Sequence, residues 1–335
     1  CYFFGILIPL FPIIFFIWYK HVIFAYTEYA SHIDSLFSNC STNPPASDSL
    51  FAVVIPFPKK QVHNVMALLY IWSLPEFSPL FDDDINLKDR TRLILYPVFN
   101  DTSMSAAINN FISDNKEVTK MLQNTFHSVE IIPRGIETRF DLHRKDYLQG
   151  QWIASGDTEM FYPMMTNIAP SLGISFVLYH EPDAFPLRKG WLSKIRSYAF
   201  SEDSDFWFLG SQQRQKKAIS GRIHGHMNGN SVIRVENQCA RNFLKRVYNE
   251  YRYLPYDTSI MRYLVNPKNL REAQHFIRRM RYTDLIGNFA HTDVQREDLM
   301  KRFPEMYIVH GKGYFKEINH LLKEGNFRTG FVDVE

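Results

Sequence analysis

The sequence has few cysteines and little net charge. Only three of its 335 residues are cysteine, Cys1, Cys40 and Cys239, which excludes a disulfide-rich scaffold and a cysteine-ligated zinc module. A bridge between Cys40 and Cys239 can form if the domain lies in an oxidising compartment, and the sequence leaves that pairing open. The formal net charge of +3 is too small and too dispersed for a nucleic-acid surface, so we expect no nucleic acid as a partner.

Charged residues are also absent from residues 1–19. A helix of this length spans roughly 28 Å, close to the ~30 Å hydrocarbon core of a bilayer. Trp18 and Tyr19, followed by Lys20 and His21, are typical of a membrane interface. The short apolar region and small-residue cleavage site of a signal peptide are both missing. We predict a transmembrane signal anchor at residues 1–19, with a buried core helix as the alternative.

The next residues indicate the compartment and the domain boundary. Two glycosylation sequons begin at Asn39 and Asn100, and with the anchor they favour a luminal or extracellular domain. Residues 20–49 are polar and rich in turn formers, which predicts a stem or linker. We therefore expect a single-pass type II membrane protein of the Golgi or ER lumen, with one soluble domain at residues 50–335.

Short apolar segments alternate with amphipathic ones from Leu50 onwards, which predicts an α/β fold with a mostly parallel central sheet flanked by helices. The carboxyl ends of such strands usually form the ligand crevice. The predicted strands cover residues 50–56, 92–97, 127–132, 174–179 and 206–211, and the predicted helices cover residues 62–73, 103–113 and 158–168.

Two acidic residues, Glu181 and Asp183, follow directly after the apolar strand at residues 174–179. Residues two apart in an extended chain point the same way, so the two carboxylates can share one cation. Mg²⁺ and Mn²⁺ prefer such oxygen ligands and bridge the phosphates of a nucleoside diphosphate. The alternative is a solvated acidic loop.

An apolar strand that ends in Glu-x-Asp resembles the DxD motif of GT-A glycosyltransferases, with Glu181 in the first acidic position. The resemblance implies a GT-A-like fold over roughly residues 50–320. It also implies that Asp183 ligates the metal directly, whereas Glu181 contacts the ribose or metal-bound water. Pro56, at the end of the first predicted strand, is a further candidate for cofactor binding, and Trp191 for substrate binding.

A glycine- and asparagine-rich segment includes His226, Asn228, Gly229 and Asn230. Such a segment lets backbone and amide groups approach a polyhydroxyl ligand closely. It is similar to the glycine-containing strand-turn-strand that touches donor sugar and acceptor in GT-A enzymes. The alternative is a type I′ hairpin turn at Asn228-Gly229.

Two carboxy-terminal residues, His310 and Lys312, follow a short apolar segment. In metal-dependent GT-A enzymes a late histidine often completes the shell of the cation and a nearby basic residue meets the diphosphate. The resemblance implies these roles for His310 and Lys312.

An inverting transfer also needs a base for the acceptor hydroxyl. Asp257 stands at the start of a helical pattern and is the first candidate, with an N-cap role as the alternative. Asp284 is the second candidate, and a retaining enzyme would need neither.

These features together predict a glycosyltransferase that moves a sugar from a nucleoside-diphosphate sugar to a hydroxyl of a glycan or glycoconjugate, with Mn²⁺ or Mg²⁺ as cofactor. A metal-dependent hydrolase using His224, His226, His310 and Asp183 is the first alternative, because His-x-His is a familiar metal pair. No HExxH motif supports it. An inactive carbohydrate-binding relative is the second alternative.

Overall fold

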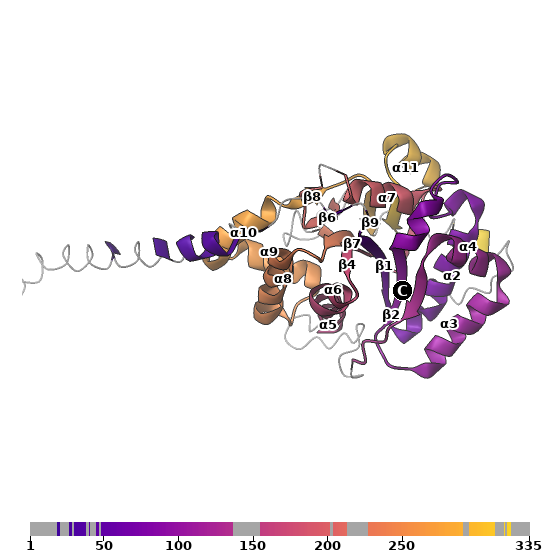
Figure 1. Ribbon diagram of the computed structural model, residues 1–335, viewed down its shortest axis with the longest axis horizontal. Coiled ribbons are helices and arrows are strands. Elements are labelled where there is room, and N and C mark those ends of the chain that lie inside the picture. Colours follow the sequence, from indigo (N-terminus) through magenta and orange to yellow (C-terminus); the bar gives the residue numbers. More distant parts are fainter. Residues whose placement is uncertain are drawn as a thin grey trace, which may run out of the picture.

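A seven-stranded sheet forms the centre of the protein in the computed structural model (Figure 1). The structure describes residues 48–136, 155–201, 204–212, 227–290 and 295–311, and short pieces at 19–20, 27–28, 30–37, 40, 45–46, 318 and 320–322. The strands of this sheet lie in the order β3 (Ser128–Ile131), β2 (Thr91–Pro97), β1 (Leu50–Phe57), β4 (Ile174–Tyr179), β7 (Met227–Arg234), β6 (Phe208–Gln212) and β8 (Met280–Tyr282).

The central sheet is mostly parallel, as predicted. Strands β3, β2, β1 and β4 pair in parallel, β7 pairs antiparallel with both β4 and β6, and β8 pairs in parallel with β6. The carboxyl ends of β1 and β4 therefore lie at the same edge of the sheet. The described part of the chain therefore has a mixed α/β fold with a seven-stranded central sheet.

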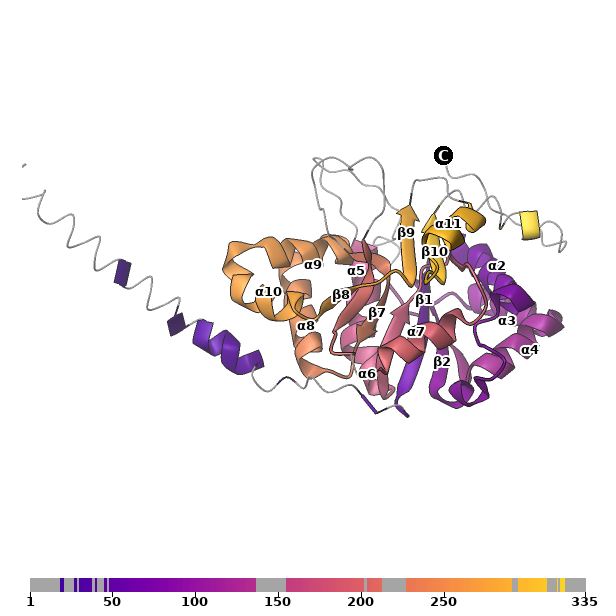
Figure 2. The ribbon, with the colours of Figure 1, turned by 90° about the horizontal axis from the view of Figure 1, so that it is seen from above.

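Helices cover both faces of the sheet (Figures 1 and 2). One face packs against α2 (Val62–Ser73), α3 (Thr102–Asp114), α4 (Lys116–Thr125), α7 (Trp191–Ala199) and α11 (Arg296–Arg302). The other face packs against α5 (Ser155–Pro163), α6 (Ala169–Ser171), α8 (Gln238–Tyr251), α9 (Tyr256–Val265) and α10 (Leu270–Ile277).

The alternation of side chains along each strand divides the core into two clusters. In β1, Phe51, Val53 and Ile55 belong to the cluster on the α2 face, whereas Ala52 and Val54 belong to the cluster on the α9 face. Because every residue of β1 beyond Leu50 is buried, the strand is a continuous apolar run instead of an alternating one.

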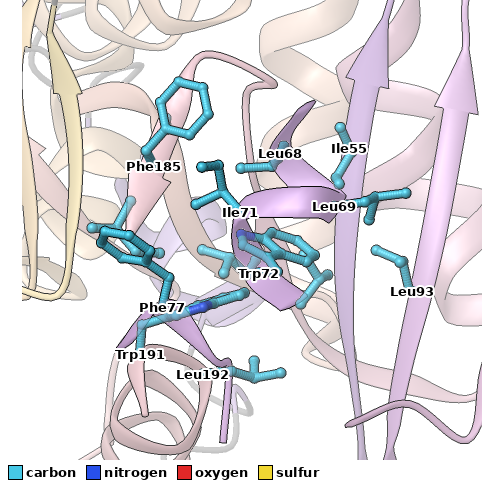
Figure 3. Packing of buried hydrophobic residues seen from close by; sticks show 14 of the residues in the cluster. Ile55, Leu68, Leu69, Ile71, Trp72, Phe77, Leu93, Phe185, Trp191 and Leu192 are labelled. Carbon is cyan, nitrogen blue, oxygen red and sulfur yellow. The ribbon is translucent and has the colours of Figure 1, made fainter. Parts of the chain in front are cut away.

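Aromatic rings fill the cluster on the α2 face (Figure 3). The rings of Trp72 and Trp191 lie 4.8 Å apart, and both side chains are fully buried. The edge of the His180 ring meets Trp72 at 5.5 Å between ring centroids. The last residues before the acidic motif are thus anchored in the core.

A second, three-stranded sheet lies beside the carboxyl end of β4. It consists of β5 (Ala184–Pro186), β10 (Ile308–Gly311) and β9 (Ile286–Ala290), in that order. β10 pairs antiparallel with β5, with His310 opposite Ala184, and in parallel with β9, with His310 opposite Asn288. This sheet brings the carboxy-terminal histidine to the acidic motif.

Part of the stretch that we expected to be a linker packs against the domain. Residues 30–37 are helical, and Ile33, Phe37 and Cys40 are buried in the cluster on the α9 face. A disulfide joins Cys40 to Cys239 at the start of α8. Beside it, Asp34 accepts a hydrogen bond from the Arg271 Nε–H at 2.8 Å.

The predicted membrane anchor lies almost entirely outside the described residues, which include only Tyr19 of residues 1–19. Within the part of the chain that is described, no helix is long and apolar enough to span a bilayer.

Most predicted elements match the observed ones, with two exceptions. The helix predicted at residues 158–168 is α5 followed by a π-helical turn, Met164–Ile168, because Pro163 has no N–H to donate and disturbs the regular ladder. The alternative of a hairpin turn at Asn228-Gly229 is wrong, because both residues belong to β7. They lie at an irregularity of its pairing with β6, between Met227 opposite Gln212 and Ser231 opposite Gly210.

Candidate metal centre and its cavity

The register of β1 and β4 places Glu181 at the carboxyl edge of the central sheet. Val54 of β1 pairs with Tyr179 of β4, and the His180 N–H donates to the Val54 carbonyl oxygen at 2.9 Å. Glu181 is the first residue beyond this ladder, next to the end of β1. The apolar strand therefore fixes the backbone from which the acidic side chains project.

Asn230 of β7 holds Glu181 through two hydrogen bonds. The Glu181 N–H donates to Asn230 Oδ1 at 2.8 Å, and Asn230 Nδ2 donates to Glu181 Oε2 at 2.8 Å. Asn230 is buried, and both bonds are partly buried. One Glu181 oxygen is thereby positioned by the protein, and the amide of Asn230 supports the acidic motif from the neighbouring strand.

Asp183 and His310 face each other across the β5–β10 pair. His310 Nε2 lies 3.3 Å from Asp183 Oδ2, and the opposite ring nitrogen, Nδ1, lies 3.2 Å from Asn288 Oδ1. Because an amide oxygen only accepts hydrogen bonds, His310 Nδ1–H donates to Asn288. Asn288 therefore orients the ring so that Nε2 points to the carboxylate, as partners of metal-ligating histidines do.

The pKa values of Glu181, Asp183 and His310 are shifted from their ordinary values. Burial lowers the pKa of His310, but the carboxylates of Asp183 and Glu181 outweigh that effect and raise it to about 9. Burial alone would raise the pKa of Asp183, and the charge of His310 reverses this so that the pKa is lowered. Burial raises the pKa of Glu181 to about 7, although His310 opposes the rise. Perturbed acids and bases in one cleft are typical of functional sites.

Glu181, Asp183 and His310 have the arrangement that a divalent cation requires. Each offers one ligand atom, and these atoms lie within 4.8 Å of one another. Two carboxylate oxygens and one imidazole nitrogen suit Mn²⁺, and the oxygens suit Mg²⁺. The residues present therefore fit the cation that the sequence predicts.

Gly229 permits the close packing beside Glu181. A Cβ atom at this position would lie 2.4 Å from Glu181 Oε1 and 2.3 Å from the Tyr256 hydroxyl oxygen. Both distances are far below ordinary contact, so a side chain would push one of these groups away. The glycine is required here by close approach within a strand.

A cavity of about 270 Å³ opens at this edge of the sheet. Its volume is close to the lower end of the roughly 300–1,000 Å³ range of small-molecule sites. The residues of the candidate metal centre line one part of it, and Asp157 of α5 and Tyr256 of α9 line another. The full lining is Pro56, Gln61, Asp157, Met160, Tyr179, Glu181, Pro182, Asp183, Tyr256 and His310.

Two further carboxylates lie near the end of the cavity that is formed by α5 and α9. Asp157 belongs to the first turn of α5, and burial, together with the charges of Asp257 and Glu181, raises its pKa to about 8. Asp257 belongs to the first turn of α9 and accepts a hydrogen bond from the Thr258 N–H. The cap position of α9 is Pro255, so the alternative of an N-cap role for Asp257 is wrong.

The structure brings some predicted site residues together and separates others. Pro56 lines the cavity as a residue of β1. Trp191, predicted to bind substrate, is instead fully buried in the core against Trp72 (Figure 3). Asp284 is exposed in the connection between β8 and β9 and is not part of the cavity lining. His226 and Lys312 lie outside the described residues, and so does His224 of the hydrolase alternative.

Asn288, Asp157 and Tyr256 are among the site residues that were not found from the sequence. Asn288 orients His310, and Asp157 and Tyr256 line the cavity. Asp157 carries a weak signal, since an acid in the first turn of a helix next to a buried strand can reach the edge of the sheet. Asn288 carries no such signal in the sequence, because its role depends on the pairing of β9 with β10.

No protein-family model matches the chain, and no curated protein matches it either. Among solved structures, the fold is similar to the galactosyltransferase LgtC in complex with donor and acceptor sugar analogues, with 11% identity, a TM-score of 0.46, and coverage of 83% of this chain and 96% of that chain. It is also similar to mouse xyloside xylosyltransferase 1, with 12% identity, a TM-score of 0.38, and coverage of 78% and 97%.

A third similar structure is the mannosyltransferase PcManGT from Pyrobaculum calidifontis in complex with GDP-Man and Mn²⁺, with 10% identity and a TM-score of 0.34. There the match covers 70% of this chain and 57% of that chain. All three are glycosyltransferases, the class that the sequence motifs resemble. At these values the similarity concerns only the arrangement of helices and strands.

Proposed function

We propose that the protein is a metal-dependent glycosyltransferase that transfers a sugar from a nucleoside-diphosphate sugar to a hydroxyl acceptor. One observation carries the proposal: Glu181, Asp183 and His310 offer three ligand atoms within 4.8 Å at the carboxyl edge of a mostly parallel sheet, in the wall of a cavity. This is the edge at which open α/β sheets bind nucleotides.

In the proposed reaction the acceptor hydroxyl oxygen attacks the anomeric carbon of the donor sugar. The bond from that carbon to the phosphate oxygen breaks, and the nucleoside diphosphate leaves with the bonding electrons. A divalent cation, when bound, supplies positive charge beside the leaving diphosphate. Asp257 is the proposed base that takes the proton of the acceptor hydroxyl in an inverting transfer.

The residues of the chain have distinct parts in this proposal. Asp183 and His310 bind the cation, and Glu181 contributes its free oxygen while Asn230 holds the other. Asn288 keeps the His310 ring in the binding orientation. Pro56 and the adjacent end of β1 lie where the nucleoside would enter the cavity. The site is thus largely preformed before a ligand arrives.

We also propose that the domain works in an oxidising compartment, anchored to the membrane by residues 1–19 as a type II protein. The disulfide between Cys40 and Cys239 supports this proposal, because disulfides persist in the ER lumen and outside the cell and are rare in the cytosol. The two sequons favour the same compartments.

A thermal-shift panel tests the proposed activity. The purified protein is melted with UDP, GDP, ADP and no nucleotide, each in Mn²⁺, in Mg²⁺, in Zn²⁺ and in EDTA. A ligand that binds only the native state raises the melting temperature, so we expect one nucleoside diphosphate to stabilise the protein in metal and to lose the effect in EDTA. Hydrolysis of a sugar nucleotide of the same base then identifies the donor.

Two other outcomes would contradict the proposal. Stabilisation by Zn²⁺ without any nucleotide would support the metal-dependent hydrolase. An absence of any metal- or nucleotide-dependent shift would support the inactive carbohydrate-binding relative.

A further inference from the structure

The hydroxyl group of Tyr256 is buried without a partner at the wall of the cavity. Tyr256 is only 7% exposed, and its hydroxyl oxygen has no hydrogen-bond partner among the described residues. A buried hydroxyl without a partner costs free energy, about 1–3 kcal/mol. Such a cost in a cavity lining indicates that a ligand supplies the missing hydrogen bond.

Packing holds this hydroxyl in place. The Tyr256 ring stacks on Phe161 with 4.1 Å between centroids and an interplanar angle of 10°. The ring of Tyr179 meets it edge-on at 5.7 Å. Gly229 leaves room for the hydroxyl, since a Cβ there would lie 2.3 Å from the oxygen. The ring therefore has little freedom to turn its hydroxyl elsewhere.

Asp157 lines the same end of the cavity from α5. It is half-buried, and its carboxyl group forms no hydrogen bond or ion pair within the described part of the chain. No lysine or arginine is among the residues that line the cavity with it. A carboxyl group and a phenol with free hydrogen-bonding capacity thus face one space.

We propose that Asp157 and Tyr256 form a subsite that binds hydroxyl groups of the transferred sugar ring, next to the metal centre. The proposal rests on the proposed glycosyltransferase function and extends it to the recognition of the donor sugar. Asp157 and Tyr256 are positioning residues for that sugar, and Asp257 remains the candidate base.

The arrangement of the cavity favours the donor sugar as the occupant. Glu181 adjoins both parts of the cavity: its ligand atom lies within 4.8 Å of those of Asp183 and His310, and a Cβ at Gly229 would lie 2.4 Å from Glu181 Oε1 and 2.3 Å from the Tyr256 hydroxyl oxygen. With the diphosphate at the metal and the nucleoside at the end of β1, the sugar bonded to the diphosphate reaches the remaining end. A polyhydroxyl ring offers both donors and acceptors, which a phenol and a carboxyl group can bind together.

Replacing Tyr256 with phenylalanine tests the subsite with little change to the core. The affinities of the parent and of Tyr256→Phe are measured by calorimetry in Mn²⁺ for UDP, GDP, UDP-glucose, UDP-N-acetylglucosamine and GDP-mannose. We expect unchanged affinity for the free diphosphate and about 5-fold weaker binding of the matching sugar nucleotide, the loss of one hydrogen bond. Because the hydroxyl has no hydrogen-bond partner among the described residues, the melting temperature of the unliganded variant should not fall.

The matched control is Tyr253→Phe, which removes the hydroxyl of an exposed tyrosine between α8 and α9. It should leave both affinities unchanged. A purely structural role for Tyr256 predicts the opposite pattern, with a lower melting temperature and equal affinity for the sugar nucleotide. That pattern would overturn the proposal.

Asp157 is tested with two variants. Asp157→Ala should weaken binding of the sugar nucleotide about 10-fold relative to the free diphosphate, because a hydrogen bond to a charged or acidic group is worth more than a neutral one. Asp157→Asn keeps a similar shape and can still bond hydroxyls, so it should recover most of the affinity. Equal binding of the sugar nucleotide by the parent and by Asp157→Ala would refute the subsite.

Failure of this inference can be distinguished from failure of the proposed function. If the parent binds a nucleoside diphosphate with Mn²⁺ but neither variant loses sugar-dependent affinity, the subsite is wrong and the transferase proposal stands. If the parent binds no nucleoside diphosphate at all, both are wrong. If Mn²⁺ titrated alone binds twice to the parent and once to Asp157→Ala, the acid holds a second cation and the sugar subsite is refuted.

Discussion

The two ends of the cavity differ in whether their polar side chains form hydrogen bonds within the protein. At the metal end, Glu181 is bonded to Asn230, and His310 is bonded to both Asp183 and Asn288. At the other end, the Tyr256 hydroxyl has no partner among the described residues. The metal end is therefore preorganised by protein contacts, whereas the other end depends on a ligand to complete its hydrogen bonds.

This difference follows from how each end is built. The metal end is built around strands: His310 belongs to β10, and Glu181 and Asp183 lie in the short connection between β4 and β5, with β5, β10 and β9 placed side by side. The other end is made by the first turns of two helices, α5 and α9. A cation needs several ligands in one fixed geometry, and strands provide that. We expect changes at the metal end to abolish nucleotide binding and changes at the other end to alter sugar recognition alone.

The largest effect is expected for Asp183→Asn, which removes a charged ligand and keeps the shape of the side chain. Metal-dependent binding of the nucleoside diphosphate should weaken by more than about 100-fold, since changes to outer partners of metal ligands already cost about 10–100-fold. The affinity for the nucleoside diphosphate is measured by calorimetry with and without Mn²⁺. The control is Asp89→Asn, an exposed aspartate that should change nothing, and parental affinity in Asp183→Asn would remove this residue from the centre.

The next largest effect is expected on the rate of sugar transfer and not on the binding of nucleotide or metal. If Asp257 is the base, Asp257→Asn should bind nucleotide and metal as the parent does and lose transfer by about 10²-fold or more, because general-base catalysis contributes roughly 10²–10⁴-fold. Affinity, melting temperature and single-turnover rate are measured on the same variant. Parental turnover would exclude Asp257 and favour a retaining pathway, or Asp284 as the base.

Asn288→Ala tests whether Asn288 holds the His310 ring in its orientation. Without the hydrogen bond at Nδ1, the His310 ring is no longer held toward Asp183, and we expect the affinity for Mn²⁺ to fall about 10-fold. Asn242→Ala is the matched control, since Asn242 is exposed on α8 and bonds only a neighbouring glutamine of the described chain. An unchanged Mn²⁺ affinity in Asn288→Ala would show that packing alone orients the ring.

A methyl group at Gly229 should disturb both ends together. The new Cβ would meet Glu181 and Tyr256 at once, and overpacking of this kind costs about 1–3 kcal/mol. For Gly229→Ala we expect weaker binding of the free diphosphate and of the sugar nucleotide, with a lower melting temperature. If only one of the two affinities changed, the two ends would be less closely connected than the structure indicates.

Removal of the disulfide is expected to have the smallest effect on ligand binding in the cavity. Cys40→Ser should lower the free energy of unfolding by about 2–5 kcal/mol, because the bridge closes a long loop between the amino-terminal segment and α8. Nucleotide and sugar-nucleotide affinities should stay at the parental values, measured well below the melting temperature. A loss of affinity without loss of stability would connect this segment to the cavity in a way that the structure does not show.

The sequence by itself determined the local elements and the position of the acidic motif. Continuous apolar runs such as Leu50–Phe57 and Ile174–Tyr179 favour buried strands of a mostly parallel sheet, because strands that are covered on both faces consist of consecutive apolar residues. Glu181 and Asp183 stand out because they follow such a strand directly. His310 was predicted through the resemblance to GT-A enzymes, in which a late histidine often completes the shell of the cation.

The tertiary structure decided which distant residues meet. Trp191 is an aromatic residue of the type that stacks on sugars. The packing of α7 instead buries it in the core, where it contributes to stability. Asn288 and Asn230 support the metal centre only because β9 lies beside β10 and β7 lies beside β4. Asp157 and Tyr256 reach one cavity from helices about a hundred residues apart. Contacts of this kind depend on strand order and helix packing, which local patterns of apolar and polar residues do not specify.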